Sequence, residues 1–337
     1  MKKKILCMLT VVVLMLSTLC ACSPKASSCS LSIDGNIIPV GTLLKVNGNA
    51  VSLFEYRYYY VLAKETLDGG DDAYWDSEDA DIEAFDELVM DNVKYYYALK
   101  KAVSDLGLKL SSANKKNIST NVKNFKKNTM NGMNYKEYLD SLYMDEYLLE
   151  QYYTQQEYYS VLREYYFGEG GPNEVSKQDV VDYVSENYHR YKQIYIRYDY
   201  DGTETNKQFA YSLVDQLENG ADFDVLMNKY TRDPTASSNP NGYYAQIIEG
   251  STLTDTLSAL EINGISGVKE NEHGYFIYKR LDMDNDVYTN LDTFRENMEL
   301  EFISSVLQAY VENADVQIVS EYYNSISFET LLYEDKE

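Results

Sequence analysis

The sequence predicts an α+β protein with a helical part and a smaller mixed part. Two long segments, Ile82 to Leu106 and Asn290 to Asn313, carry apolar residues at steps of three and four, which is typical of amphipathic helices. Between them, Gln193 to Tyr198 and Tyr275 to Leu281 alternate as strands do. The cluster Gly168 to Pro172 separates the two parts, because Gly and Pro end regular structure. Helices followed by such a mixed unit indicate the α+β class.

Length, charge and composition narrow the class of protein. A chain of 337 residues is long enough for about two domains, and a formal net charge of -24 argues against a protein that binds the backbone of nucleic acids. A hydrophobic content of 45% indicates a folded chain rather than a disordered acidic one. Tyrosine is in excess, with 35 residues against 10 Phe and 1 Trp. Because tyrosine joins an apolar ring to a hydroxyl that tolerates water, this excess suits half-buried faces and binding surfaces.

The N-terminus resembles a bacterial lipoprotein signal. A basic start is followed by an apolar run from Ile5 to Leu16, which is short for a membrane span. The run ends in Leu19-Cys20-Ala21-Cys22, where the resemblance implies removal of residues 1–21 and lipidation of Cys22. An ordinary signal peptide or a membrane anchor is the alternative. Residues 22–43 are then predicted to be a polar tether.

The four cysteines do not predict a disulfide framework. Cys7 and Cys20 would leave with the signal, Cys22 would carry lipid, and Cys29 would then have no partner. We therefore expect the mature chain to fold outside the cytoplasm without disulfides.

The helical part is predicted to open with a strand-turn-strand over residues 44–51. Asn47-Gly48 is the hairpin signal, and Ser52 is placed to cap the next helix. Gly107 ends the helix that starts at Ile82. Two further helical stretches are predicted, a basic one from Ser111 or Ser112 and a Tyr-rich one over 135–167.

An acidic loop over residues 67–81 holds the only tryptophan, Trp75. Its carboxylates lack the ordered spacing of a calcium loop, so a solvated acidic face is favoured over a calcium site. The two histidines, His189 and His273, have no partners at a metal-binding spacing, and no metal site is predicted. The acidic residues of the loop are Asp68, Asp71, Asp72, Asp76, Glu78, Asp79 and Asp81.

Five short motifs in the mixed part resemble the core of parvulin-type peptidyl-prolyl isomerases, in family order and spacing, over about residues 190–283. They are Gly220-Ala221-Asp222-Phe223, Tyr230-Thr231-Arg232-Asp233, Asn241-Gly242-Tyr243, Gly264 to Lys269, and His273 to Lys279. The predicted elements fit this resemblance. They are a helix over 176–188, a strand over 193–198, helices over 206–219, 222–230 and 253–260, and a strand over 275–281.

The segment Val46-Asn47-Gly48 with the aromatic helix after it resembles the chaperone domain of SurA/PrsA-type foldases. In that family the helical domain is completed by a helix after the isomerase unit, and Asn290 to Asn313 would supply it. With its lipoprotein signal, the chain resembles the PrsA-like extracytoplasmic foldases of Gram-positive bacteria. The domains implied are a helical chaperone-like domain over 44–172 plus 285–320, an inserted parvulin-like domain over 173–284, and an acidic tail over 321–337.

Rotation about an X-Pro bond faces a barrier of about 18–20 kcal/mol, and its catalysis needs no nucleophile, metal or cofactor. It needs an apolar pocket for the proline ring and polar groups that favour the twisted amide. The resemblance places a catalytic role on Asp233 and two histidines on adjacent strands. Ile194 and Phe276 are predicted to stand at those histidine positions. The residues expected to bind peptide are Tyr195, Tyr243, Tyr244 and Phe276.

Two functions follow from the resemblance. The first is a membrane-anchored foldase that holds secreted chains on aromatic surfaces and isomerises X-Pro bonds. The second is a non-catalytic holdase or structural lipoprotein with a degenerate parvulin domain, which the absence of both histidines favours for the chemistry. A solute-binding lipoprotein is disfavoured, because the α/β repeats of its two lobes are not visible. The expected partners are unfolded secreted polypeptides and the membrane, not nucleic acid. Whether a homodimer forms is left open.

Overall fold

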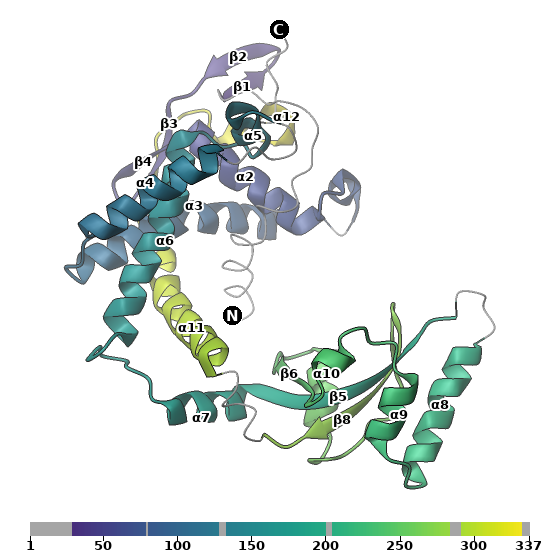
Figure 1. Cartoon of the computed structure of the whole chain (residues 1–337). Coiled ribbons are helices and arrows are strands. Elements are labelled where there is room, and N and C mark those ends of the chain that lie inside the picture. Colours follow the sequence, from purple (N-terminus) through teal and green to yellow (C-terminus); the bar gives the residue numbers. More distant parts are fainter. Residues whose placement is uncertain (1–28, 79, 128–132, 200–203, 284–290, 332–337) are drawn as a thin grey trace. The chain divides into compact units, whose positions relative to one another are not determined.

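The computed structural model describes residues 29–78, 80–127, 133–199, 204–283 and 291–331 (Figure 1). The predicted signal segment and Cys22 lie outside these residues. The described chain forms two units, unit 1 with residues up to 174 and from 299 on, and unit 2 with residues 175–298. The α+β class is confirmed, with a mixed unit inserted in a helical one. Among the described residues, no helix has both the length and the apolar character that a bilayer span requires.

Short antiparallel strands open unit 1. Strands β1 and β2 form a two-stranded sheet. A second sheet has the order β4-β3-β9, so that β9, which follows the last long helix, pairs with β3 near the start of the described chain. The predicted Asn47-Gly48 turn is confirmed, with positive φ angles of 49° and 74° as a tight hairpin turn needs. The strands are β1 (Ser30–Ile33), β2 (Asn36–Pro39), β3 (Thr42–Val46), β4 (Asn49–Ser52) and β9 (Val316–Ile318).

The prediction of a polar tether over 22–43 is wrong for its second half, because β1, β2 and the start of β3 lie there. Leu31 in β1 is fully buried in the core of unit 1. The turn Asp34-Gly35 closes the hairpin with positive φ angles at both residues. Leu31 and Ile33 alternate with serines before this turn, and Asp-Gly is itself a hairpin signal. These local signals outweigh the polar composition that suggests a tether.

Helices make up the rest of unit 1. The predicted cap is confirmed, because Ser52 Oγ accepts a hydrogen bond from Glu55 N at 3.1 Å. The division between the units falls inside α11, the last long helix. The helices are α2 (Leu53–Asp68), α3 (Ile82–Asp105), α4 (Ser112–Lys127), α5 (Tyr135–Ser141), α6 (Glu146–Phe167), α11 (Leu291–Glu312) and α12 (Phe328–Leu331), with short 3-10 turns η2 (Asp72–Asp76) and η5 (Tyr323–Ser325).

The single helical stretch predicted over 135–167 is two helices. Tyr143 lies between them with φ +54°, a left-handed conformation that interrupts a helix. The side chain of Asp145 then accepts a hydrogen bond from Leu148 N at 2.8 Å and caps α6. The break is made by a tyrosine rather than by glycine or proline, so the capping residue Asp145 is the local sign of a new helix in the sequence.

The acidic tail predicted over 321–337 is also wrong as far as residue 331, because this segment packs into unit 1. Leu331 is fully buried. The ring of Phe328 lies 4.8 Å from that of Trp75, 5.2 Å from that of Phe85 and 5.4 Å from that of Tyr60, measured between centroids. A few large apolar side chains therefore anchor a segment whose overall composition is acidic.

The adjacent tyrosines of α2 and α3 pack into more than one hydrophobic cluster. Tyr59, Tyr60 and Tyr97 are buried in one hydrophobic cluster, whereas Tyr95 belongs to another. A run of adjacent tyrosines on a helix points in several directions, and here each direction meets packed neighbours. Much of the tyrosine excess is thus core material, and Tyr147 and Tyr165 on α6 are examples that stay exposed.

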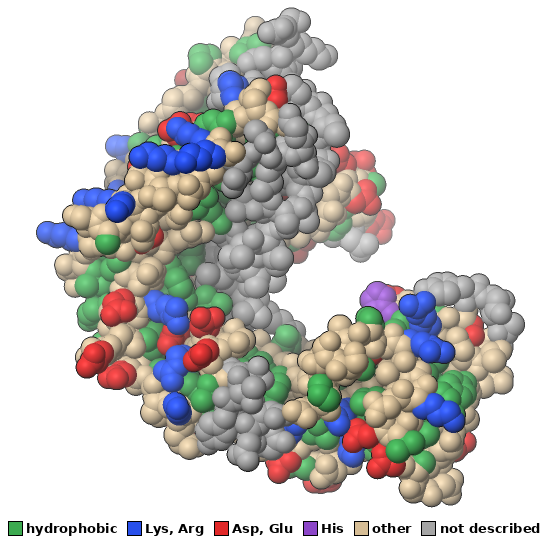
Figure 2. All heavy atoms as spheres, viewed as in Figure 1, with side chains coloured by type: hydrophobic (Ala, Val, Ile, Leu, Met, Phe, Trp, Pro, Cys, Tyr) green, Lys and Arg blue, Asp and Glu red, His purple; other side chains and the backbone are tan. Residues whose placement is uncertain are grey.

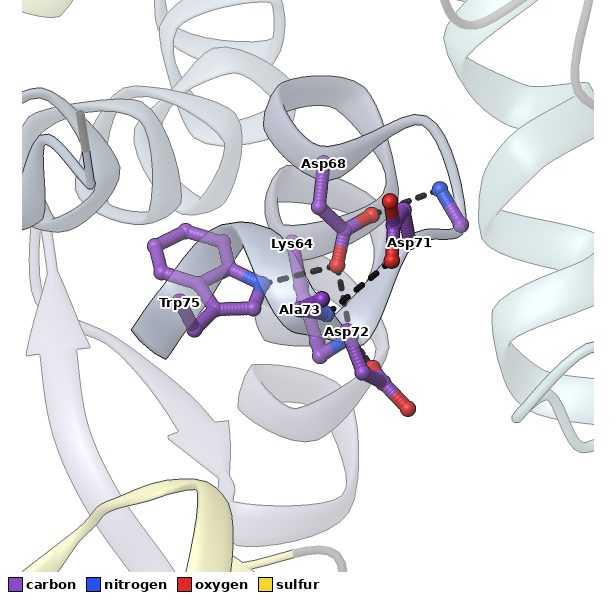
Figure 3. A network of polar contacts seen from close by, with 7 residues as sticks. Lys64, Asp68, Asp71, Asp72, Ala73 and Trp75 are labelled. Carbon is purple, nitrogen blue, oxygen red and sulfur yellow. Dashed lines mark hydrogen bonds and ion pairs between the residues drawn. The ribbon is translucent and has the colours of Figure 1, made fainter. Parts of the chain in front are cut away.

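The acidic loop folds back on α2 through Asp68, whose side chain is fully buried (Figure 3). Its Oδ2 accepts hydrogen bonds from Lys64 Nζ at 2.6 Å and Trp75 Nε1 at 2.7 Å, and its Oδ1 accepts one from Gly70 N at 2.7 Å. Lys64 also pairs with Asp72. The buried carboxylate of this loop is thus neutralised by the chain's own lysine and not by an open cation site.

Unit 2 is built on a four-stranded antiparallel sheet with the order β6-β5-β8-β7. The two central strands, β5 and β8, were predicted from their alternating apolar residues. The short outer strands, β6 and β7, were not predicted. The elements are α7 (Lys177–Asn187), β5 (Tyr188–Arg197), α8 (Thr205–Glu218), α9 (Phe223–Tyr230), η3 (Ala236–Ser238), β6 (Tyr243–Gln246), α10 (Thr252–Ser258), β7 (Lys269–Asn271) and β8 (Gly274–Leu281).

The sheet of unit 2 has one apolar face, covered by α8 and α9. Ile194 and Ile277 are fully buried there, against Leu213 of α8 and Phe223 of α9. Because successive side chains of a strand point to opposite faces, Gln193 and Tyr195 lie on the other face. That second face carries the candidate site.

Candidate functional site

The open face of the sheet presents a row of aromatic rings across three strands. Tyr195 of β5 and Phe276 of β8 are directly paired in the sheet, and their rings stack at 4.8 Å with an interplanar angle of 15°. The row continues through Phe276–Tyr278 at 5.9 Å, Tyr278–Tyr191 at 5.9 Å and Tyr191–Tyr243 at 5.5 Å. Tyr278 is buried, and the other four rings remain partly exposed.

The segment after α9 is fastened to β5 by the backbone. Arg232 N donates to Tyr195 O at 2.7 Å, and Thr231 Oγ1 accepts from Tyr195 N at 3.1 Å. The same hydroxyl oxygen accepts from Asp233 N at 3.3 Å. These bonds set Asp233 beside the ring row.

Asp233 is the polar centre of this face. Its Oδ2 accepts hydrogen bonds from Gln193 Nε2 and from the hydroxyl of Tyr243, both at 2.7 Å. Its Oδ1 accepts from the backbone N of Thr235 at 2.9 Å and from the Thr235 hydroxyl at 2.7 Å. Every acceptor position of the carboxylate therefore faces a neutral donor of the chain.

These contacts decide the charge of the site. Burial opposes the ionised form of Asp233, but the hydrogen bonds from Gln193, Thr235 and Tyr243 outweigh it and lower the pKa. Burial, together with the nearby Tyr243 and Asp233, raises the pKa of Tyr191 to about 12. Burial and the nearby Asp233 also raise the pKa of Tyr243, so at neutral pH Asp233 is ionised while Tyr191 and Tyr243 keep their protons.

The structure corrects the placement of Ile194 at the first histidine position. Ile194 is fully buried on the face that α8 and α9 cover, so it does not reach Asp233. Gln193 is the residue of β5 that contacts Asp233. An offset of one residue moves a strand side chain to the opposite face, and the alternation of Ile194 and Ile196 as the apolar pair was the signal that could have shown it.

Phe276 does lie on the open face, next to the ring of Tyr195. The hydroxyl of Tyr195 donates to the backbone O of His273 at 2.9 Å and so fastens the turn between β7 and β8. Tyr191 and Tyr278 complete the row, and neither was predicted as a site residue. Tyr191 lies outside the quoted motifs, and Tyr278 lies inside the last of them without having been assigned to the site. Only the pairing of β5 with β6 and β8 brings the two rings together.

Tyr244 does not join the other predicted peptide-binding residues. It follows Tyr243 in β6 and so points to the opposite face of the sheet. Its ring packs against Phe294 of α11 at 5.0 Å. Because Phe294 also packs against Tyr188 at 5.2 Å, the start of α11 belongs to unit 2, and the boundary lies further along the chain than the predicted residue 284.

The two histidines of the chain lie away from Asp233. His189 is buried at the start of β5, where its Nε2 lies 2.8 Å from Ser258 Oγ of α10. Burial, together with Arg280, lowers the pKa of His189, so its ring is neutral at pH 7. His273 sits in the exposed turn before β8, 3.4 Å from Glu272. Neither can replace a histidine beside Asp233.

Within the parts of the chain that the structure describes, no group of three or more His, Cys, Asp and Glu residues is arranged to hold a metal. A shallow cavity of about 270 Å³ also occurs in unit 2, but none of the predicted site residues lines it. Its lining residues are Arg190, Lys192, Asn241, Asn263, Leu281 and Asp282.

The arrangement offers exposed ring faces beside a carboxylate that is already hydrogen-bonded on both oxygens. Exposed ring faces stack on proline rings and on apolar side chains. The hydroxyl of Tyr243 and the amide of Gln193 are polar donors on the same face, and both are directed at Asp233. The polar groups of this face are thus hydrogen-bonded to one another.

Comparison with known proteins agrees with the motifs. Residues 182–283 match the family model of the PPIC-type PPIASE domain. Among solved structures, the chain is similar to the peptidylprolyl isomerase PrsA of Bacillus anthracis, with 17% identity and a TM-score of 0.33, covering 65% of this chain and 93% of that one. It is similar to foldase protein PrsA of Streptococcus pneumoniae, with 13% identity and a TM-score of 0.33, covering 84% of this chain and 97% of that one.

PrsA of Bacillus subtilis is also similar, with 18% identity, a TM-score of 0.27 and coverage of 70% of this chain and 89% of that one. No curated protein matches the chain. The family model covers nearly the whole of the sheet and helices that carry the aromatic row and Asp233. Residues 182–283, which form most of unit 2, are therefore the part of the chain that is similar to the PPIC-type, that is parvulin-type, domain.

Proposed function

We propose that this chain is an extracytoplasmic chaperone whose parvulin-type domain binds segments of unfolded polypeptides on its aromatic row and contributes little isomerase activity. The observation that carries the proposal is the polar centre of the row. Asp233 is held by Gln193 and Tyr243, and Phe276 stands on the adjacent strand, so the two positions where the family resemblance expects histidine hold an amide and a benzyl ring.

The physical argument concerns transition-state stabilisation. An isomerase accelerates rotation only if its polar groups bind the twisted amide better than the planar one. Here the Tyr243 hydroxyl and the Gln193 amide both donate to a charged carboxylate, and such charge-assisted bonds are stronger than neutral ones. A passing peptide carbonyl would have to compete with that carboxylate for each donor. The rings keep their exposed faces, so binding persists where catalysis is weakened.

The proposed location rests on the N-terminal segment. Its basic start, apolar run and Leu19-Cys20-Ala21-Cys22 ending suit export and lipidation of Cys22 on the outer face of the cell membrane. The clients would then be secreted polypeptides that fold outside the cytoplasm. Similarity to PrsA proteins, which bear the names foldase and peptidylprolyl isomerase, supports this assignment.

An active isomerase is the second candidate. The match of residues 182–283 to the PPIC-type family and the presence of Asp233 at the family's acidic position favour it. The two candidates differ in what they require of the ring row. A holdase needs it as a binding surface only, whereas an isomerase needs donors that are free to turn toward the substrate amide.

Refolding of a protein limited by proline isomerisation separates the two. With the chain from residue 22 onward added at catalytic amounts, we expect no acceleration of the slow phase. At equimolar amounts we expect it to suppress aggregation of a denatured client. Acceleration of the slow phase at catalytic amounts would establish isomerase activity. If the chain neither accelerates this phase nor suppresses aggregation, both candidate functions are excluded.

A further inference from the structure

The sequence between Asp105 and Glu137 has an unusual charge distribution. It contains seven lysines and no Asp or Glu, in a chain whose net charge is -24. Helix α4, which was predicted as a basic helix, lies in this stretch. The lysines are Lys109, Lys115, Lys116, Lys123, Lys126, Lys127 and Lys136.

Helix α4 gathers five of these lysines on one side. At about 100° per residue, they fall within an arc of roughly 120° around the helix axis. The apolar residues Ile118 and Val122 lie beside that arc and are buried, and α4 packs against α6. All five lysines are exposed, and Figure 2 shows the blue side chains gathered along α4. We call Lys115, Lys116, Lys123 and Lys127 the lysine face.

The charges of the lysine face do not serve the fold of unit 1. Lys126, next to the face, pairs with Glu146 of α6 at 2.7 Å. Among the residues that the structure describes, none of the four members of the face has a carboxylate within 4.0 Å. The face has no aspartate or glutamate at i,i+4 to relieve the repulsion between its lysines. An uncompensated group of like charges at this place therefore points to an external anion.

We propose that the lysine face contacts the anionic lipid headgroups of the membrane to which the chain is anchored. The proposal rests on the proposed lipid anchor at Cys22. From Cys22 to Ser30 the chain spans at most roughly 30 Å, so a lipid at Cys22 keeps unit 1, which contains both β1 and α4, near the bilayer. Lysines near an anionic bilayer surface are attracted to it over a Debye length of about 8 Å.

The rest of the chain explains why one face is needed. Outside the stretch from Asp105 to Glu137, acidic residues outnumber basic ones, so an anionic bilayer repels most of the surface. A lysine-only helix on such a protein orients it, because only this side is attracted. A second copy is the less favoured occupant, since a two-fold contact through the lysine face would set lysines against lysines.

Vesicle binding tests the proposal without the anchor. The chain from residue 22 onward, with Cys22→Ser, is sedimented with vesicles of phosphatidylglycerol and phosphatidylcholine, and with phosphatidylcholine alone, at about 50 mM salt. We expect binding to the anionic vesicles only, reversed by salt. Replacing Lys115, Lys116 and Lys123 by Gln should weaken it about 100-fold, since one lysine near the surface contributes about fivefold.

A matched triple variant controls for net charge. Replacing the exposed Lys45, Lys177 and Lys229 by Gln removes the same three charges from other parts of the surface, and we expect less than a threefold loss. No binding to anionic vesicles, or an equal loss in the two triple variants, would overturn the proposal. Concentration-dependent assembly that only the first triple variant abolishes would assign the face to a second copy instead.

The outcome is separable from the proposed function. Suppression of client aggregation in vesicle-free buffer should be unchanged by the first triple variant, because the lysine face lies outside the aromatic row. If the unmodified chain suppresses no aggregation yet binds anionic vesicles through the lysine face, the chaperone proposal fails and this inference stands. Incorporation of labelled fatty acid into the full chain in cells, and its loss on Cys22→Ser, tests the anchor itself.

Discussion

Gln193 donates a hydrogen bond from Nε2 to Oδ2 of Asp233 over 2.7 Å, and so joins the central strand β5 to the segment that follows α9. This bond places a neutral amide beside the carboxylate to which the family resemblance assigned a catalytic role. It also shows that Gln193, and not Ile194, is the residue of β5 that contacts Asp233 on the open face of the sheet.

Histidine substitutions at Gln193 and Ile194 should differ strongly in their effect on the stability of unit 2. Gln193→His places an imidazole on the half-exposed open face and should change the free energy of unfolding of unit 2 by less than about 1 kcal/mol. Ile194→His puts a polar ring into a fully buried site and should cost about 3 kcal/mol. Chemical denaturation monitors both. Similar costs for the two variants would contradict the assignment of faces.

The carboxylate of Asp233 should stabilise unit 2 through its charge-assisted hydrogen bonds. Asp233→Asn should lower the free energy of unfolding by about 1–2 kcal/mol. The exposed Asp215 on α8 supplies the control, and Asp215→Asn should have an effect below about 0.5 kcal/mol. Thermal or urea unfolding distinguishes the two, and equal effects would show that the hydrogen bonds contribute nothing.

The pH dependence of the same variant has a defined sign. Because the pKa of Asp233 is lowered in the folded chain, its stabilisation is present above the ordinary value of 3.8 and is lost as pH falls through the folded pKa. The difference between wild type and Asp233→Asn should therefore stay constant from about pH 5 to 8. A change centred near pH 6.5 would indicate a histidine in the site.

The aromatic row should carry the binding of unfolded polypeptide to unit 2. Phe276→Ser removes the ring that stacks on Tyr195 and should weaken binding by about tenfold. Tyr211→Ser removes an exposed ring from α8, 52% exposed and on the other side of the sheet, and should leave binding unchanged. Fluorescence anisotropy of a labelled unfolded client measures both. An equal loss of client binding in the two variants would show that the aromatic row is not the binding surface.

A buried carboxylate in unit 1 should make its stability depend on pH. Glu55 is 2% exposed and accepts hydrogen bonds from Tyr97 at 2.8 Å and Gln151 at 3.0 Å, which join α2 to α3 and α6. Burial raises its pKa, although those hydrogen bonds act in the other direction. The raised pKa means that stability falls as pH rises from the ordinary value of 4.5 through the folded pKa.

Glu55→Gln tests that sign. The amide keeps an acceptor for Tyr97 and carries no charge, so it should stabilise unit 1 at neutral pH by about 1 kcal/mol, and the gain should vanish at a pH below 4.5. Urea unfolding at several pH values measures it. Destabilisation at neutral pH that persists in acid would show that Glu55 acts through packing or geometry rather than through its charge.

The C-terminal segment should stabilise unit 1 although its composition is acidic. Phe328→Ala removes a ring that contacts Trp75 and Phe85 and should cost about 2 kcal/mol. Val319→Ala, at a side chain that is 50% exposed, should cost less than about 0.5 kcal/mol. If the two variants unfold alike, the segment is not part of the core.

Local signals in the sequence predicted the elements that depend on neighbouring residues. The Asn47-Gly48 turn and the Ser52 cap each need only a few adjacent side chains, and both are confirmed. Elements that depend on residues far away in the sequence were not predicted. Phe328 becomes structural only because Trp75 and Phe85 lie beside it, and the short strand β6 forms only because β5 is next to it.

The site shows the same limit. The motif Tyr230-Thr231-Arg232-Asp233 singled out Asp233 as a candidate, and the structure places its carboxylate among hydrogen bonds from Gln193, Thr235 and Tyr243. Its partner in β5 depended on an offset of one residue, and a motif without its histidine cannot fix that offset. The rings of Tyr191 and Tyr278 come together only through strand pairing, which the sequence does not state.

Exchange spectroscopy by NMR on a short X-Pro peptide tests the central claim most directly, because it reports binding and isomerisation in one sample. With the chain from residue 22 onward, the account predicts shifts and broadening of the peptide signals without cis–trans exchange peaks, and loss of the shifts on Phe276→Ser. Exchange peaks between the cis and trans forms at catalytic amounts of the chain would contradict it.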